Sequence, residues 1–200
     1  IKASIHPYDE APFPVDDFKR AGIFQSAQDE LVIPLRSRYR LAIFGGGLDT
    51  QPLVAMALNL GWQVDLIDER ASYARNHDFP GARVYKQPVD SLPEGFERNL
   101  DAIIIMQHNL ALDAKALRVA QEIDKAGYLG YLGLLGPPHR RERVLEKSEL
   151  KVNDFNCFFS APTGFALGGE LPESVALSIL AQCHCVLHGA KQTPLDQVMI

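Results

Sequence analysis

The sequence predicts an α/β fold with a doubly wound, mainly parallel sheet and an extended N-terminal arm. Three observations predict it. From residue 41 onward, short apolar runs alternate with segments of helical periodicity. A glycine-rich turn joins the first apolar run to the first helical segment, and an acidic residue ends the second run. Alternation of this kind gives a parallel sheet with right-handed crossovers.

Five short runs rich in apolar residues are predicted strands, because strands covered on both faces are continuously apolar. They are residues 41–44, 64–68, 83–85, 102–106 and 127–132. Four segments are predicted helices, from apolar residues at helical spacing or from proline and glycine at their ends. They are residues 50–60, 112–125, 138–150 and 173–188.

The start of the chain differs from the rest, because prolines and acidic residues interrupt it repeatedly. We expect residues 1–40 to form an arm that packs on the main domain, with one short strand at residues 31–35. Residues 41–190 form the predicted main domain and residues 191–200 a tail. The chain begins with Ile1 rather than Met, which leaves open that it is a fragment of a longer protein.

Composition excludes several classes of partner. The net charge is −5, from 20 Lys and Arg against 25 Asp and Glu, whereas nucleic acids and anionic membranes require a basic face. No apolar run approaches the ~20 residues that span a bilayer. Three cysteines have neither the number of a disulfide framework nor the spacing of a zinc site, so we expect no metal and a reducing cytoplasm. On a helix, Cys183 and Cys185 would point about 200° apart, so they could not both bind one metal ion.

The glycine-rich turn, Gly45-Gly46-Gly47-Leu48-Asp49-Thr50, resembles a dinucleotide-binding loop in which Thr50 replaces the third glycine. In such loops the first glycine makes the tight turn and the second lets the backbone approach a pyrophosphate. The phosphate then lies at the N-terminus of the following helix, where N–H groups and the helix dipole favour an anion. These features predict a Rossmann-like domain; the alternative is a glycine turn kept for packing.

Asp68 ends the second predicted strand about 20 residues past the glycine loop, where a ribose-binding carboxylate belongs. It favours an NAD-like ligand, while Arg70 keeps an NADP-like ligand open. Gln107 and His108 follow the fourth predicted strand, so we expect them in the same crevice at the carboxyl edge of the sheet. His108 is either an acid–base or phosphate-binding group, or a cap of the next helix.

Two arginines, Arg140 and Arg141, begin a predicted helix after the turn at Gly136. They are candidates for an anion clamp or for docking an acidic partner; the alternative is a solvated helix face. Asp113 is interpreted as a helix N-terminal carboxylate that matches the dipole rather than as a catalytic base.

Several segments, taken together and in order, resemble the C-terminal Rossmann domain of the XdhC/CoxI family of xanthine dehydrogenase accessory factors. The segments are residues 41–47, 67–70, 106–109, 112–113, 131–136, 161–164 with Gly168, and 172–181. The resemblance implies a protein that binds molybdenum cofactor (molybdopterin), assists its sulfuration with a cysteine desulfurase, and delivers it to a molybdenum hydroxylase apoenzyme. It implies a cofactor-binding chaperone rather than a turnover enzyme.

Combining motif and resemblance, the candidate cofactor-binding residues surround the crevice, and His108 is the candidate catalytic residue. The cofactor-binding set is Gly45, Gly46, Gly47, Leu48, Asp49, Thr50, Asp68, Arg70, Gln107, His108 and Gly136; Arg140 and Arg141 are the anion or partner candidates. The ligand is molybdenum cofactor or an NAD(P)-like nucleotide.

Two other functions remain open at this point. The first is an NAD(P)-dependent oxidoreductase, for which His108 is the one recognisable catalytic candidate. The second is a non-catalytic regulatory relative that keeps only the fold, because Leu48, Ser160 and Ala166 stand where the family carries polar residues. A homodimer is a further expectation.

Overall fold

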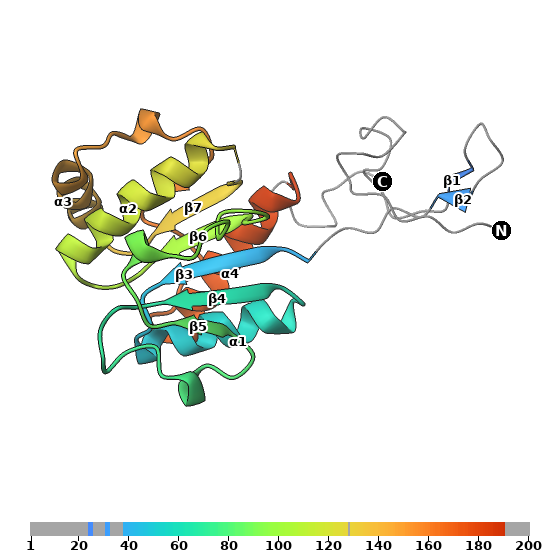
Figure 1. Ribbon diagram of the computed structural model, residues 1–200, viewed down its shortest axis with the longest axis horizontal. Helices are drawn as coiled ribbons and strands as arrows, with labels where there is room; N and C mark the ends of the chain where they lie inside the picture. The colour runs from blue at the N-terminus through green and yellow to red at the C-terminus, as the bar shows by residue number, and fades with distance from the viewer. Residues whose placement is uncertain (1–23, 26–30, 33–37, 128, 191–200) are drawn as a thin grey trace. The chain divides into compact units, whose positions relative to one another are not determined.

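The computed structural model describes residues 24–25, 31–32, 38–127 and 129–190 (Figure 1). The chain divides into two compact units, residues 1–37 and 38–200. In the first unit, β1 (Phe24–Gln25) pairs antiparallel with β2 (Leu31–Val32). β2 forms the start of the predicted strand at 31–35. The rest of that strand, the predicted packing of the arm and the predicted tail lie outside the described residues.

The second unit is built on a parallel sheet of six strands in the order β5-β4-β3-β6-β7-β8. The strands are β3 (Arg40–Phe44), β4 (Gln63–Ile67), β5 (Arg83–Tyr85), β6 (Ala102–Ile105), β7 (Tyr131–Leu134) and β8 (Phe158–Ser160). The chain runs outward from β3 in one direction and then returns to β6 for the other. The predicted doubly wound α/β class is therefore confirmed, with its switch point between β3 and β6.

Helices cover both faces of the sheet (Figure 1). They are α1 (Gln51–Asn59), α2 (Leu110–Lys125), α3 (Pro138–Ser148) and α4 (Pro172–Leu187), with short 3-10 turns η3 (Leu48–Thr50), η4 (Asn76–Asp78), η5 (Val89–Ser91) and η6 (Val152–Asp154). Successive strand residues point to opposite faces. Leu41 and Ile43 of β3 therefore pack with α1 and α4, whereas Ala42 and Phe44 pack with α2 and α3.

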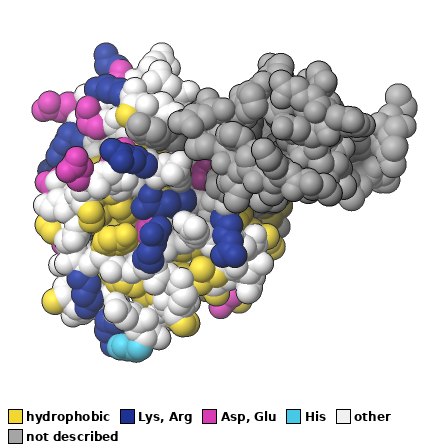
Figure 2. Space-filling model, turned by 45° about the vertical axis from the view of Figure 1, so that its right-hand side comes forward, with side chains coloured by type: hydrophobic (Ala, Val, Ile, Leu, Met, Phe, Trp, Pro, Cys, Tyr) yellow, Lys and Arg dark blue, Asp and Glu magenta, His cyan; other side chains and the backbone are white. Residues whose placement is uncertain are grey.

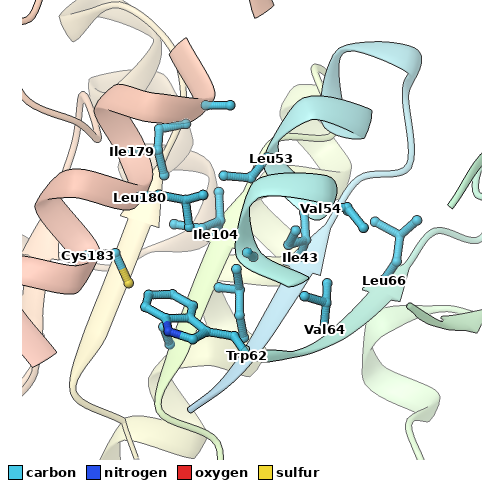
Figure 3. Packing of buried hydrophobic residues seen from close by; sticks show 14 of the residues in the cluster. Ile43, Leu53, Val54, Trp62, Val64, Leu66, Ile104, Ile179, Leu180 and Cys183 are labelled. Atoms are coloured by element: carbon cyan, nitrogen blue, oxygen red, sulfur yellow. The ribbon is translucent and has the colours of Figure 1, made fainter. Parts of the chain in front are cut away.

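The core between the sheet, α1 and α4 is closed at its lower end by Trp62, which follows the turn after α1 (Figure 3). Trp62 is buried against the same cluster as Cys183 of α4, and its ring meets the edge of Tyr39 at a centroid distance of 5.7 Å. A buried aromatic ring of this size removes much apolar surface from water and so contributes strongly to stability. No helix of the described part of the chain is both long and apolar enough to cross a bilayer.

The predicted strand at 127–132 is wrong in its position, because β7 begins at Tyr131. Gly127 takes a left-handed conformation (φ +80°) just after α2 and thus belongs to the helix end, where glycine is favoured. An apolar run alone does not mark where such a turn gives way to a strand. The other strands and helices agree with the prediction to within two residues.

The edge strand β8 was not predicted. Its position depends on Asp124, a buried residue near the end of α2, whose carboxylate accepts hydrogen bonds from the backbone N–H groups of Asn156 (2.6 Å) and Cys157 (2.9 Å). This long-range contact joins α2 to the segment that enters β8. Local sequence patterns carry no signal for such a contact.

Candidate binding site at the switch point

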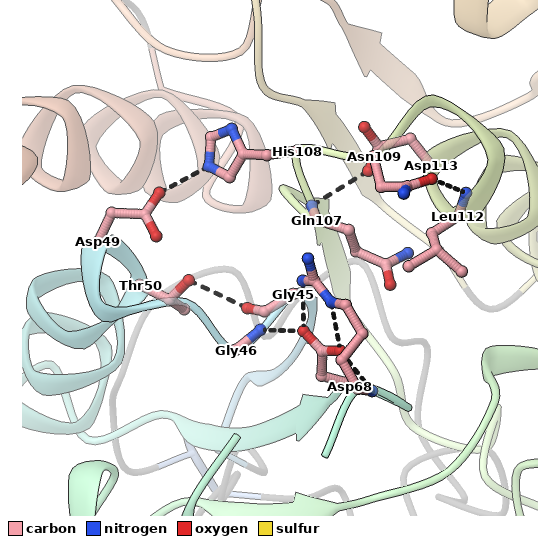
Figure 4. Close-up of polar contacts among 11 residues, drawn as sticks. Gly45, Gly46, Asp49, Thr50, Asp68, Gln107, His108, Asn109, Leu112 and Asp113 are labelled. Carbon is pink, nitrogen blue, oxygen red and sulfur yellow. Dashed lines mark hydrogen bonds and ion pairs between the residues drawn. The ribbon is translucent and has the colours of Figure 1, made fainter. Parts of the chain in front are cut away.

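The glycine loop leaves β3 at the switch point and passes directly over the end of β6 (Figure 4). Gly45 takes a φ of +126°, and a Cβ atom there would lie 2.5 Å from the carbonyl oxygen of Met106. Only glycine fits this turn without moving the neighbouring strand. The Thr50 hydroxyl donates to the Gly45 carbonyl at 3.0 Å, and Thr50 is fully buried, so its side chain holds the loop onto the start of α1.

Gly46 is in contact with protein on the side where a dinucleotide-binding loop would meet pyrophosphate. Its N–H donates to Asp68 Oδ2 (2.8 Å), and its carbonyl accepts from the Ala74 N–H (3.0 Å). A Cβ atom on Gly46 would lie 2.6 Å from both N and Cβ of Ala74. The segment after β4, rather than a pyrophosphate, therefore makes the close approach that this glycine permits.

The Asp68 carboxylate is fully buried and all its described hydrogen bonds are internal (Figure 4). Besides Gly46 N–H, it accepts from Arg70 Nε (2.9 Å), Arg70 Nη2 (2.6 Å) and the Arg70 backbone N–H (3.0 Å). Burial acts to raise the pKa of Asp68, but the hydrogen bonds from Arg70 and Gly46 outweigh it and hold that pKa below its usual value. The Arg70 guanidinium in turn lies 3.6 Å from the centroid of the Tyr73 ring.

His108 reaches across the crevice from the end of β6 to the glycine loop (Figure 4). Its Nε2 lies 2.7 Å from Asp49 Oδ2. The hydrogen bond to Asp49 raises the pKa of His108 and lowers the pKa of Asp49. His108 does not cap α2, so that alternative is wrong: Asn109 does, because its side chain accepts from the N–H groups of Ala111 and Leu112.

Asp113 connects the end of β6 to α3. Its carboxylate accepts from the backbone N–H of Gln107 (3.1 Å) and from the guanidinium Nη2 of Arg140. Burial raises the pKa of Asp113, although Arg140 acts in the opposite direction. Asp113 thus does more than match the helix dipole: it brings together two of the predicted site residues.

Two buried N–H donors, on two residues that Asp113 contacts, have no hydrogen-bond partner among the described residues. They are Nε2 of the Gln107 amide and Nε of the Arg140 guanidinium. Leaving a buried donor unpaired costs ~1–3 kcal/mol, and such groups in folded proteins usually meet water, an ion or a ligand. Both lie at the carboxyl edge of the sheet, where open α/β sheets bind their ligands.

The remaining candidate residues have separate positions. Arg141 donates to the Ala161 carbonyl at 3.1 Å, so it holds the segment after β8. Gly136 (φ +129°) leaves room for the Arg140 side chain, which a Cβ atom would meet. Leu48 is exposed on η3. On the face shown in Figure 2, Lys and Arg side chains lie in separate groups among hydrophobic and acidic ones.

A cavity of about 220 Å³ opens beside the His108–Asp49 pair, between α1, α4 and the ends of β6 and β7. Its walls are largely apolar, and its charged or ionisable members are Asp49, His108 and Glu170. The apolar wall consists of Leu53, Met106, Leu135, Pro172, Val175, Ala176 and Ile179. None of these apolar residues was predicted for the site, because in the sequence a wall of this kind is indistinguishable from core.

The cysteines lie away from this cavity. Burial raises the pKa of Cys157 to about 12 and that of Cys183 further still. Cys185 Sγ donates to the Ala190 carbonyl at 3.0 Å. Within the described residues, no group of three or more His, Cys, Asp or Glu side chains is arranged to hold a metal ion.

A family model, described as the XdhC Rossmann domain, matches residues 41–183, which include the glycine loop and the strands on both sides of the crevice. The chain belongs to the XdhC family. The sequence resemblance predicted a Rossmann domain of this family, and the match confirms that prediction.

Two relatives extend this comparison. The chain is 27% identical over 164 residues to a probable xanthine dehydrogenase subunit from Bacillus subtilis, covering 80% of this chain and 46% of that protein. It is also similar to the crystal structure of a xanthine dehydrogenase from Bacillus halodurans, with a TM-score of 0.63 and 27% identity, covering 85% of this chain and 48% of the other. The XdhC-family chain therefore spans about half the length of each of these relatives.

Proposed function

We propose that this XdhC-family chain is an accessory factor for a molybdenum hydroxylase of the xanthine dehydrogenase type. It binds molybdenum cofactor for sulfuration and insertion, and it acts as a carrier rather than a turnover enzyme. Family membership supports the accessory role, and the names of the two Bacillus relatives support an association with xanthine dehydrogenase. The binding role depends on whether the crevice suits such a ligand.

A dinucleotide laid across the glycine loop does not fit the residues present. Both oxygens of Asp68, the carboxylate expected to bind ribose, accept hydrogen bonds from Arg70. Gly46, the glycine expected to face pyrophosphate, is covered by Ala74. This geometry disfavours the NAD(P)-dependent oxidoreductase, and we derive no hydride-transfer step for the protein.

The unpaired donors of Gln107 and Arg140 carry the proposal. Asp113 holds both residues, Gln107 through its backbone N–H and Arg140 through its guanidinium, and their unpaired side-chain N–H groups would donate to oxygen atoms of a phosphate, such as the phosphate of molybdopterin. The Gln107 amide carries no net charge, while Arg140 supplies a positive charge opposite the phosphate. When bound, the cofactor supplies the molybdenum centre that the hydroxylase uses; the chain supplies orientation and hydrogen bonds.

The proposal includes protein partners. These are the hydroxylase apoenzyme, a cysteine desulfurase and a second copy of this chain, in the cytoplasm. Exposed leucines at positions 48 and 171 lie on the two elements, η3 and the start of α4, that contact each other next to the cavity. Their exposure supports a protein contact at this edge.

The test is native mass spectrometry of protein purified without oxygen from cells supplied with molybdate. The variants are Gln107→Met, which removes the amide at nearly constant volume, and Arg140→Lys, which keeps the charge near Asp113 but removes Nε–H. Gln121→Met is the matched control, because Gln121 lies on α2 and donates to Asp154 instead.

We expect pterin and molybdenum in the wild type and in Gln121→Met, with at least a roughly tenfold loss of bound cofactor in the two crevice variants, since a hydrogen bond to a charged group contributes ~1.5–3 kcal/mol. Retention of cofactor by Gln107→Met would contradict the assigned position. A nicotinamide dinucleotide in place of pterin would favour the oxidoreductase. An empty wild type that also fails to take up added cofactor would favour the non-catalytic relative that keeps only the fold.

A further inference from the structure

His108 is held in an unusual backbone conformation that directs its ring to the glycine loop. Its φ is +55°, in the left-handed region that non-glycine residues rarely adopt. Such conformations are energetically unfavourable for residues with a side chain, and they cluster at functional sites. The conformation lets His108 leave the end of β6, cross the crevice and meet Asp49, which lies at the start of the opposite helix (Figure 4).

The contact with Asp49 sets the tautomer of the ring. The pKa of Asp49 is lowered by its hydrogen bond with His108, so the carboxylate is ionised at neutral pH and can only accept. In the neutral ring the proton therefore lies on Nε2 of His108. Nδ1 is left with a lone pair, and it makes no hydrogen bond among the described residues.

Other charges around the ring act in both directions. Asp113 and Asp49 favour the imidazolium form of His108, whereas Arg140 opposes it. Glu170 enters the same cavity from the segment before α4. The pair thus combines a lone pair at Nδ1 with a carboxylate that stabilises the ring once it is protonated, as in enzymes that use histidine as a base.

The adjoining cavity limits what this base can meet. Its volume of about 220 Å³ is below the ~300–1,000 Å³ of drug-sized ligand pockets, and all of its lining residues except Asp49, His108 and Glu170 are apolar. It suits a compact, mostly apolar molecule, or the apolar end of a larger one. The polar part of the ligand would lie beside His108, Asp49 and Glu170.

We propose that the cavity binds a compact apolar molecule that carries one weakly acidic O–H, N–H or S–H group, and that His108 removes its proton. The X–H bond breaks, its electron pair stays on X, and a new bond forms between the proton and Nδ1. The result is an anion next to an imidazolium ring that Asp49 stabilises. Asp49 is a positioning residue, since it acts through His108. This inference is independent of the accessory function, because neither Gln107 nor Arg140 lines the cavity.

The probe for the test is 4-nitrophenol, a small ring with a weakly acidic O–H whose anion absorbs visible light. The variants are His108→Gln and Asp49→Asn. A second histidine–aspartate contact on the surface supplies matched controls: His77 Nε2 lies 3.4 Å from Asp78 Oδ1, and neither residue lines the cavity. His77→Gln and Asp78→Asn repeat the same chemical changes elsewhere.

We expect the wild type to bind 4-nitrophenol as its anion at a pH where the free probe is mostly neutral. In His108→Gln the absorbance of the bound anion should be at least about tenfold lower than in the wild type. In Asp49→Asn the pKa of His108, measured by NMR titration, should be lower by about one unit. Both controls should match the wild type. The proposal is overturned if His108→Gln keeps the anion signal, if the folded wild type does not bind the probe, or if Asp49→Asn leaves the pKa of His108 unchanged.

One measurement needs no variant. The ¹⁵N chemical shifts of the neutral His108 ring in the wild type report which nitrogen carries the proton. The proposal requires the proton on Nε2. A ring protonated at Nδ1 has no lone pair facing away from Asp49 and would rule out the assigned role.

Discussion

The Arg70 guanidinium donates to the Asp68 carboxylate from both Nε (2.9 Å) and Nη2 (2.6 Å), and it lies over the Tyr73 ring. In a dinucleotide-binding fold the corresponding carboxylate faces a ribose. Here the guanidinium of Arg70, two positions later in the sequence, binds this carboxylate instead. The pair therefore turns a position associated with ligand binding into one that stabilises the segment after β4.

Replacing Arg70 should destabilise the domain. Arg70→Met leaves the buried Asp68 carboxylate with backbone N–H partners alone, so we expect the free energy of unfolding to fall by about 2–3 kcal/mol. The control is Arg75→Met, because Arg75 is 48% exposed in its pair with Asp78 and should change stability by less than about 1 kcal/mol. Urea denaturation measures both. Equal losses would contradict the assigned role of the Asp68 pair.

The same pair has a defined acid dependence. Because the folded pKa of Asp68 lies below its ordinary value of 3.8, its contribution is present above that pH and is lost as pH falls through the folded pKa. The difference in stability between the wild type and Arg70→Met should thus narrow below pH 3.8. A difference that widens toward low pH would be inconsistent with this linkage.

The second and third glycines of the loop should differ in their tolerance of a side chain. In Gly46→Ala the new Cβ atom would meet N, Cα and Cβ of Ala74 at 2.6–2.7 Å, so we expect a loss of about 1–3 kcal/mol. In Gly47→Ala it would meet the flexible end of Asp49 and, at an ordinary contact distance of 3.8 Å, the Tyr73 ring, so the change should be within about 0.5 kcal/mol. Thermal or urea unfolding without ligand tests both, and a harmless Gly46→Ala would mean that the glycine is kept for a ligand after all.

The start of α4 lacks a side-chain cap. Leu171 occupies the N-cap position in an extended conformation, is 67% exposed and makes no capping hydrogen bond. Leu171→Ser should raise the free energy of unfolding by about 0.5–1.5 kcal/mol, because a hydroxyl can accept from the free N–H groups of the first turn. Leu167→Ser removes a similarly exposed leucine (53%) from the preceding segment and should have little effect. If both variants behave alike, capping is not the cause.

The Cys157 thiol should react slowly with disulfide reagents at neutral pH. Burial, followed by the Asp124 carboxylate, raises the pKa of this thiol to about 12. Asp124→Asn removes the negative charge and should increase the rate of modification by about tenfold, as a shift of one pKa unit implies. Glu122→Gln, an exposed change on the same helix, is the control. Thiol labelling followed by peptide mass spectrometry locates the modified cysteine, and an unchanged rate at Cys157 would count against the role of Asp124.

The His108–Asp49 pair should contribute to stability in a limited range of pH. The folded pKa of His108 lies above 6.5, so the contribution is fully present below that pH and disappears as pH rises through the folded pKa; it also falls at low pH, where Asp49 becomes protonated. We expect Asp49→Asn to cost about 0.2–1 kcal/mol near pH 5–6 and less above pH 8. Asp78→Asn is the matched comparison. A cost that grows with rising pH would have the wrong sign.

Sequence patterns were enough to predict the fold class and the position of the glycine loop. These depend on local signals: apolar runs that alternate with helical periodicity, a glycine turn at a strand end, and an acidic residue after the next strand. The sequence also placed Gln107 and His108 in the crevice, because residues that follow parallel strands meet at one edge of the sheet. Strand boundaries near Gly127 and the edge strand β8 were not determined, because they depend on where a helix ends and on the Asp124 contact.

The contacts of the site residues, in contrast, depend on how the folded chain brings distant segments together. Sequence spacing identifies Asp68 as a ribose carboxylate, but a buried carboxylate binds whichever donor the fold brings nearest, and here that donor is Arg70. Likewise, the spacing of residues in the sequence does not predict the contact between His108 and Asp49. This contact forms because β3 and β6 are adjacent strands that end at the same edge of the sheet, and because the backbone of His108 is left-handed. Hydrogen bonds are short-ranged and directional, so residues far apart in the sequence acquire their partners only once the strands are in register.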